Sequence, residues 1–194
     1  MKSMLRMILS LTLLCAVTSG ILVYARAITI NKIQVQQLTF VQGPILDVVL
    51  EGATNNPIEN RFTLAYGDKE ISFFPATFSN GQRVVAFETF GMGYGGDVGV
   101  MVAINIDTEK IVGMDITTHS ETPGLGSQAK TNDEFKRQFT THKITDSFRP
   151  VVRGGNIDVI TGATITSNAV CNAVNQTSVI YQKLQPEITK QIQE

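Results

Sequence analysis

A long run without charge near the amino terminus is the feature that most limits how this chain can fold. Residues Met7–Ala25 contain no charged side chain, and a helix of that length rises about 28 Å, close to the thickness of about 30 Å of a bilayer's hydrocarbon core. We therefore predict a single membrane-spanning helix, with residues 1–27 forming a cytoplasmic amino terminus and an anchor. Lys2, Arg6 and the amino terminus precede the run, while Arg26 and Lys32 follow it, so the charge bias toward a cytoplasmic amino terminus is small.

A cleaved signal peptide is the alternative interpretation of the same segment. Ala25-Arg26-Ala27 has the small-residue pattern of a cleavage site. The apolar core of a signal peptide is normally shorter than this run, which favours a retained anchor. In both cases the rest of the chain would lie on the periplasmic or extracytoplasmic side of the cytoplasmic (inner) membrane.

The composition favours an α+β fold and excludes several classes of function. Sixteen glycines are many for a helical bundle and suit a turn-rich domain. Acidic and basic residues nearly balance, 17 against 16, so the chain lacks the electrostatic footprint of a nucleic-acid-binding protein. Cys15 and Cys171 lack the spacing of a zinc or iron–sulfur site, and His119 and His142 lie too far apart for a local ligand pair. Redox chemistry in this chain would need an organic cofactor.

Periodic patterns predict an antiparallel sheet with packing helices. From Val98 to Ile106, β-branched residues alternate with others, which is typical of a half-buried strand, and Ile111–Thr118 returns as its hairpin partner. Shorter strands are predicted at Arg61–Tyr66, Ile71–Phe74, Val84–Thr89 and Ile157–Ile160. Helices are predicted over Ile30–Val49 (interrupted at Gly43-Pro44), Asn132–Thr140 and Ser167–Leu184, the last ended by Pro186. We divide the chain after the anchor into residues 28–90, a core at 91–185 and a tail at 186–194.

A glycine-rich segment, Gly91–Gly96, matches the GxGxxG pattern of dinucleotide-binding sites. That pattern has its physical meaning only between a strand and a helix. The strongest strand of the chain follows here instead, so we reject a dinucleotide site. Two interpretations remain, a flexible turn entering a hairpin and a bare backbone that lets a flat ligand approach closely.

A second segment, His119–Gly126 (HSETPGLG), follows the predicted hairpin. Pro123 stiffens its backbone, whereas Gly124 and Gly126 permit close contact. Glu121 and Thr122 add an acceptor and a hydroxyl. Such a loop suits a flat isoalloxazine ring with a polar edge, although a loop that simply ends a strand would have the same composition.

A third segment, Asp158–Ser167, opens the predicted carboxy-terminal helix. Its hydroxyl side chains could cap exposed amide groups, or the helix terminus could accept a phosphate. No adjacent His, Lys or Cys would activate Thr164 as a nucleophile. If a covalent bond forms at Thr164, another enzyme must therefore make it.

These segments together resemble a known family. The TGAT at Thr161–Thr164, with Asp158 before it and Thr166 after it, resembles the flavinylation motif of FMN-binding domains. HSETPGLG and the glycine-rich segment resemble the other two segments of that family, in the same order. Within the family, the short chain and early anchor resemble the G subunit of the Rnf electron-transport complex. The related C subunit of sodium-translocating NADH:quinone reductase tends to be longer.

The resemblance implies a function and a set of site residues. FMN would be joined covalently to Thr164 through a phosphoester, made by a separate Mg²⁺-dependent flavin transferase. The chain would be the electron-carrying subunit of a membrane complex that couples ferredoxin–NAD electron transfer to sodium or proton transport, without substrate turnover of its own. Its partners would be the other subunits and the transferase. The implied site comprises Thr161, Gly162, Ala163 and Thr166 around the phosphate, and Glu121, Thr122, Gly124, Leu125, Gly126 and nearby Tyr94 around the ring.

Three alternatives stay open at this point. The chain could be a C-type subunit of sodium-translocating NADH:quinone reductase. It could be a membrane-anchored regulatory protein that binds FMN noncovalently. It could also be a cofactor-free surface domain in which all three loops are structural.

Overall fold

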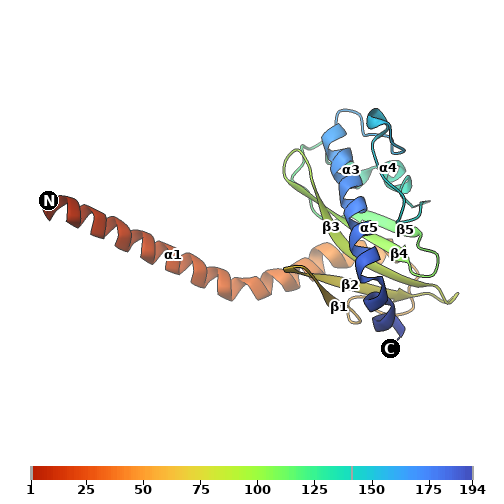
Figure 1. Cartoon of the computed structure of the whole chain (residues 1–194), viewed down its shortest axis with the longest axis horizontal. Helices are drawn as coiled ribbons and strands as arrows, with labels where there is room; N and C mark the ends of the chain where they lie inside the picture. Colours follow the sequence, from red (N-terminus) through yellow and green to blue (C-terminus); the bar gives the residue numbers. More distant parts are fainter. Residues whose placement is uncertain (1, 141, 194) are drawn as a thin grey trace. The chain divides into compact units, whose positions relative to one another are not determined.

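The computed structural model describes residues 2–140 and 142–193, which form two compact units, Met1–Phe40 and Val41–Glu194. The elements follow one another in the order α1 (Lys2–Gln36), η1 (Gln37–Gln42, a π-helix), α2 (Gly43–Val49), β1 (Phe62–Tyr66), β2 (Lys69–Thr77), β3 (Arg83–Met92), β4 (Asp97–Asn105), β5 (Ile111–Ile116), α3 (Gln128–Thr131), α4 (Asp133–Arg137), η2 (Val151–Arg153, a 3₁₀-helix) and α5 (Thr164–Gln193). Figure 1 shows them in sequence colours.

The first unit consists of α1, which contains the predicted anchor. Ser3–Ile30 has a mean hydropathy of 2.1 and is long and apolar enough to cross a membrane. Several hydroxyl groups within it bond to the helix itself, since Thr12 donates to the carbonyl of Ile8 at 2.9 Å and Thr18 to that of Leu14 at 2.9 Å. The helix therefore presents an almost wholly apolar surface along this stretch.

The second unit is built on a five-stranded antiparallel sheet in which the strands follow their sequence order, β1-β2-β3-β4-β5. The predicted hairpin is confirmed, with Val102 of β4 opposite Met114 of β5. The three shorter predicted strands before it are also present, and β2 and β3 extend beyond their predicted ends. The sheet is thus a simple meander, as short turns between adjacent antiparallel strands allow.

Both faces of the sheet are covered at β4, which corrects the prediction of a half-buried strand. One face carries the valines of β4 and packs against α5, which crosses the sheet in Figure 1. The opposite face carries Met101 and Ala103, which are also fully buried. Helix α2 lies on that side, so close that a Cβ on Gly113 would meet the carbonyl oxygen of Val49 at 2.7 Å. Alternation along β4 therefore separates two apolar cores and does not separate core from solvent.

The carboxy-terminal helix corrects a second prediction, because α5 runs through Pro186 to Gln193. An apolar stripe explains its length: Ile180, Leu184 and Ile188 are buried at a spacing of four residues, and Ile192 packs on the same core. A proline inside a helix costs about 3 kcal/mol. Fully burying Ile188 contributes about 1.5–3 kcal/mol and partly burying Ile192 adds to it, so the cost of the proline is offset and the helix continues. Residues 186–193 belong to the core helix and do not form a separate tail.

Other predicted boundaries also change. The predicted strand Ile157–Ile160 is wrong: Ile157 forms only an isolated parallel bridge with Pro150. At the predicted interruption, Gly43-Pro44, the helix type changes. The π-helix η1 ends at Gln42, and α2 begins at Gly43 with proline in its first turn. The boundary predicted between residues 90 and 91 falls inside β3.

The helix predicted at Asn132–Thr140 is present in shortened form as α4. The Asn132 side chain caps it by accepting the amide of Phe135 at 3.0 Å. Phe135 and Phe139 are both buried, with ring centroids 5.6 Å apart in an edge-on arrangement. The four-residue spacing of these two rings therefore places both of them against the core. Helix α3 before it was not expected from the sequence.

Candidate FMN site

The glycine-rich segment forms the turn between β3 and β4, which confirms that it is not a dinucleotide motif. Gly93 donates its amide to the carbonyl of Gly96 at 2.9 Å to close the turn. A Cβ on Gly91 would lie 1.9 Å from the carbonyl oxygen of Ala169 in α5, and one on Gly95 would lie 2.0 Å from that of Ser120. These glycines are explained by close backbone packing within the protein. The turn interpretation therefore accounts for them without a ligand.

Glu121 joins all three segments that the sequence singled out. Its side chain is buried, and Oε1 accepts the amide of Gly95 at 2.9 Å. Oε2 accepts the hydroxyl of Thr166, in the first turn of α5, at 2.5 Å. We expected Glu121 to offer an acceptor to a bound ring. The structure shows instead that both carboxylate oxygens already hold the glycine turn and the helix start in place.

The two glycines of the HSETPGLG loop have different roles. A Cβ on Gly126 would lie 2.6 Å from Glu121 Oε2 and 2.7 Å from Thr166 Oγ1, so glycine permits the Glu121–Thr166 contact. Gly124 adopts a positive φ of 76° with open space beside it. It therefore serves the backbone conformation of the loop.

The hydroxyl groups at the start of α5 differ in their hydrogen-bond partners. Ser167 Oγ accepts the amide of Ile160 and donates to the carbonyl of Ala163, both at 3.0 Å. Ser167 thus ties the segment before α5 to the helix and does not cap the amides of its first turn, while the Thr166 hydroxyl is bonded to Glu121. Thr164, the first residue of α5, is exposed, and no hydrogen bond of its hydroxyl is recorded within the described part of the chain. Thr164 is therefore the accessible hydroxyl within the first turn of α5, and Thr161, which is also exposed, lies before the helix begins.

The amide groups of this helix start are also available. The first backbone hydrogen bond into α5 runs from the amide of Ser167 to the carbonyl of Ala163. In the described residues, the amides of residues 164–166 have no recorded acceptor, as is usual for the first turn of a helix. Gly162 precedes them with a φ of 78° and turns the chain into the helix. This arrangement attracts negative charge.

A cavity of about 450 Å³ lies between the HSETPGLG loop and the start of α5, within the usual range of small-molecule sites. Its lining contains nine of the eleven residues predicted for the site: Tyr94, Glu121, Thr122, Leu125, Gly126, Gly162, Ala163, Thr164 and Thr166. Thr161 and Gly124 neighbour this lining in the chain but do not belong to it. Residues from three distant segments thus meet at one cavity.

Ile165 also lines the cavity and was missed by the sequence analysis. Its side chain is 51% exposed although it is a large apolar residue. Tyr94 and Leu125 share this property, with exposed fractions of 74% and 46%. The sequence did contain a signal for this role. Ile165 is an apolar residue between Thr164 and Thr166, at a helix position that faces away from the core. The rim of the cavity is therefore apolar and accessible.

Comparisons with known proteins support the same region. A family described as "FMN-binding domain" matches residues 93–178. The G subunit of an ion-translocating oxidoreductase complex from Buchnera aphidicola is 32% identical over 168 residues, covering 81% of this chain and 78% of the relative. This chain belongs to the same G-subunit family.

Two further known proteins resemble this G-subunit family member in sequence or in fold. The G subunit of a proton-translocating ferredoxin:NAD(+) oxidoreductase complex from Clostridium ljungdahlii is 31% identical over 170 residues, covering 86% of this chain and 85% of the relative. The crystal structure of NqrC from Shewanella oneidensis has a TM-score of 0.53 and 21% identity, covering 72% of each chain, and shares the fold. The family match and this shared fold confirm the predicted α+β FMN-binding domain, and the chain also has the predicted apolar amino-terminal helix.

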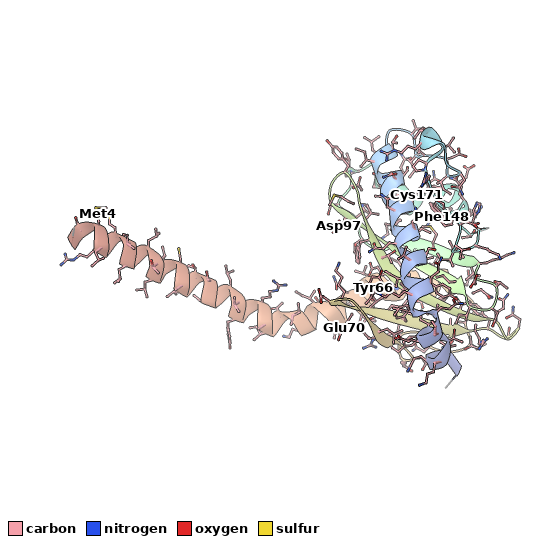
Figure 2. The ribbon with its side chains drawn as sticks, viewed as in Figure 1. Met4, Tyr66, Glu70, Asp97, Phe148 and Cys171 are labelled. Atoms are coloured by element: carbon pink, nitrogen blue, oxygen red, sulfur yellow. The ribbon has the colours of Figure 1, made fainter. Side chains whose placement is uncertain are left out.

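The residues at the cavity fit FMN. The cavity wall contains apolar side chains, which suit a planar ring, and the start of α5, which suits a phosphate. Glu121 is its one carboxylate, and the lining contains no lysine, arginine, histidine or cysteine. Cys171, two turns further along α5 and labelled in Figure 2, is buried. Burial raises the pKa of its thiol to about 12, so it is not a nucleophile.

Proposed function

We propose that this G-subunit family member is the electron-carrying flavoprotein subunit of a membrane-bound, ion-translocating oxidoreductase, with FMN esterified to Thr164. The observation that carries the proposal is the position of Thr164. Its exposed hydroxyl stands at the first residue of α5 and at the wall of the 450 Å³ cavity. A phosphate on this oxygen would lie beside the helix start, and the attached ring would be able to enter the cavity.

The protein's groups would bind each part of the cofactor differently. The available amides of residues 164–166 would stabilise the phosphate through hydrogen bonds and the helix dipole. Leu125 and Tyr94 would cover the apolar part of the ring. Thr122, exposed beside the cavity, would offer its hydroxyl to the polar edge. FMN itself would supply reversible electron transfer when bound.

The environment of Thr164 supports attachment by a separate enzyme. The cavity lining offers no histidine, lysine or cysteine to remove the proton of the hydroxyl. Glu121, its single carboxylate, is hydrogen-bonded to Thr166 and Gly95. A flavin transferase would therefore have to bring the base and any metal ion to the exposed threonine.

The accessible rim supports electron transfer between protein carriers. Tyr94, Ile165 and Leu125 leave the cavity edge exposed, so a neighbouring carrier would approach the flavin closely without a diffusing substrate. The relatives are named as subunits of complexes, and one name specifies a ferredoxin:NAD(+) oxidoreductase. We propose the same role here, in a complex that moves sodium or protons, with α1 as the single membrane anchor.

The topology of the anchor follows from charge. Lys2, Arg6 and the amino terminus precede the apolar stretch and Arg26 and Lys32 follow it, a small excess that favours a cytoplasmic amino terminus. The FMN-binding domain would then lie on the periplasmic or extracytoplasmic side of the inner membrane. A covalent link is advantageous there, because a dissociated cofactor would be lost from the cell.

Intact-mass measurement tests the proposed attachment. The full chain is co-expressed with a flavin transferase, and we expect an added mass of one FMN esterified with loss of water, together with flavin fluorescence of the denatured band on a gel. Thr164→Ala should lose both signals, whereas Thr164→Ser, which keeps a hydroxyl, should retain them. Flavin that is released on denaturation would support the noncovalent regulatory alternative. A colourless protein would support the cofactor-free alternative.

A further inference from the structure

The proposed ester raises a question of charge balance. A phosphate that joins Thr164 to FMN keeps one negative charge near neutral pH. The cavity beside it already contains the carboxylate of Glu121 and no lysine or arginine. Helix amides offset only part of a full charge, about half an elementary charge at a helix start. A cation close to the first turns of α5 would complete the site.

A tightly hydrogen-bonded loop places one arginine at this position. The carbonyl of Arg149 accepts the amides of Asn156 at 2.9 Å and Ile157 at 3.0 Å, which closes the loop at its base. Gly155 has no room for a side chain, since a Cβ would lie 2.0 Å from the Arg149 carbonyl oxygen. The loop between these contacts contains η2, whose last residue is Arg153. Its backbone is therefore fixed, while the Arg153 side chain is exposed.

The Arg153 side chain reaches the face of α5 that carries Thr164. Its Nη1 donates to Asn168 Oδ1 at 3.4 Å. Asn168 is four residues after Thr164, and residues at this spacing are neighbours on one helix face, about 5–6 Å apart between their Cβ atoms. The guanidinium is thus held about one helical turn from the attachment oxygen.

The guanidinium is free to take an anionic partner. Arg153 is exposed and takes part in no salt bridge recorded among residues 2–140 and 142–193. Its bond to the neutral amide of Asn168 is long, so little would be lost if the guanidinium turned toward Thr164. Arginine matches phosphate oxygens with paired donors.

We infer that Arg153 is the counter-cation of the phosphate on Thr164, presented to this face of α5 by the 149–157 loop. This inference rests on the proposed function. It adds a residue outside the cavity lining and outside the flavinylation motif. It also gives the rigid loop a role, which is to keep a positive charge beside an ester that the cavity itself cannot neutralise.

The test compares flavin-loaded and flavin-free forms of the full chain in detergent. For each variant we measure the loaded fraction by intact mass and the melting temperature of both forms, and we take the difference as the stabilisation due to the cofactor. Arg153→Gln should leave the melting temperature of the flavin-free form unchanged and reduce the stabilisation. Arg153→Lys should restore part of it, because the charge returns without the paired donors. Raising the salt concentration should reduce the stabilisation in the wild-type chain more than in Arg153→Gln.

A matched control removes the same charge elsewhere. Arg137→Gln, at an exposed position of α4, should leave the stabilisation unchanged. Equal changes of both melting temperatures in Arg153→Gln would mean that the arginine only supports the fold, and would overturn the inference. An undiminished stabilisation in Arg153→Gln would also overturn it, while the proposed function would stand. Absence of the added mass in the wild-type chain would overturn the proposed function and this inference together.

Discussion

Loss of the Glu121 carboxylate should separate the three segments that build the FMN site. Glu121 is 6% exposed, and its carboxylate accepts two hydrogen bonds, from the Gly95 amide and the Thr166 hydroxyl. Hydrogen bonds to a charged group contribute about 1.5–3 kcal/mol each. In the variant, water from the adjacent cavity can hydrogen-bond to the Gly95 amide and the Thr166 hydroxyl, so we take the lower value for both bonds. Glu121→Ala should therefore lower the free energy of unfolding by about 3 kcal/mol.

The contribution of the Glu121–Thr166 hydrogen bond can be isolated by a double-mutant cycle. Thr166→Val removes only the hydroxyl donor and should lower the free energy of unfolding by about 1.5 kcal/mol. In the Glu121→Ala background the same substitution should have little further effect, which gives a coupling energy of about 1.5 kcal/mol.

Equilibrium urea unfolding of the full chain in detergent, followed by near-ultraviolet circular dichroism, measures these differences. Thr118→Val, which removes an exposed hydroxyl near the same loop, is the control and should change the free energy by less than about 0.5 kcal/mol. A coupling energy below about 0.5 kcal/mol would refute the reasoning. Glu121 would then not connect the HSETPGLG loop to α5.

Two further predictions follow from the packing of α5. Gly91→Ala should destabilise the second unit by more than about 3 kcal/mol, because the new Cβ would lie 1.9 Å from a backbone oxygen of Ala169; thermal unfolding measures this, and an unchanged melting temperature would contradict the geometry. Cys171 should resist thiol reagents at neutral pH in a Cys15→Ser chain and react on unfolding, because burial raises its pKa to about 12. A raised pKa means that the folded state favours the neutral thiol. Cys171 therefore contributes stability below its ordinary pKa near 9, and this stability is lost as the pH rises through about 12. Cys171→Ala should remove this part of the loss of stability at alkaline pH.

The sequence predicted the elements well where a pattern repeats within one segment. The alternation of Val98–Ile106 and the apolar run of Met7–Ala25 both specify their element locally, and both are confirmed. The end of α5 was predicted wrongly because proline was given more weight than the stripe of Ile180, Leu184 and Ile188. That stripe was visible in the sequence.

The site was predicted from its motifs, yet its internal bonds were not. The three segments could be recognised in the sequence, and nine of the eleven predicted residues line one cavity. That Glu121 bonds Gly95 and Thr166 could not be foreseen. Its partners lie 26 and 45 residues away, and no local pattern reports a contact at such separation.

By itself the sequence determined most of the helical and extended segments and where a flavin motif stands, because backbone preferences and side-chain periodicity act over a few neighbouring residues. Only the tertiary structure decided that both faces of β4 are buried, that the Thr166 hydroxyl is engaged while that of Thr164 is accessible, and that Arg153 lies against the helix face carrying Thr164. These facts depend on which distant surfaces pack together. Packing is set by the fit of whole elements, which the order of residues in any one segment does not contain.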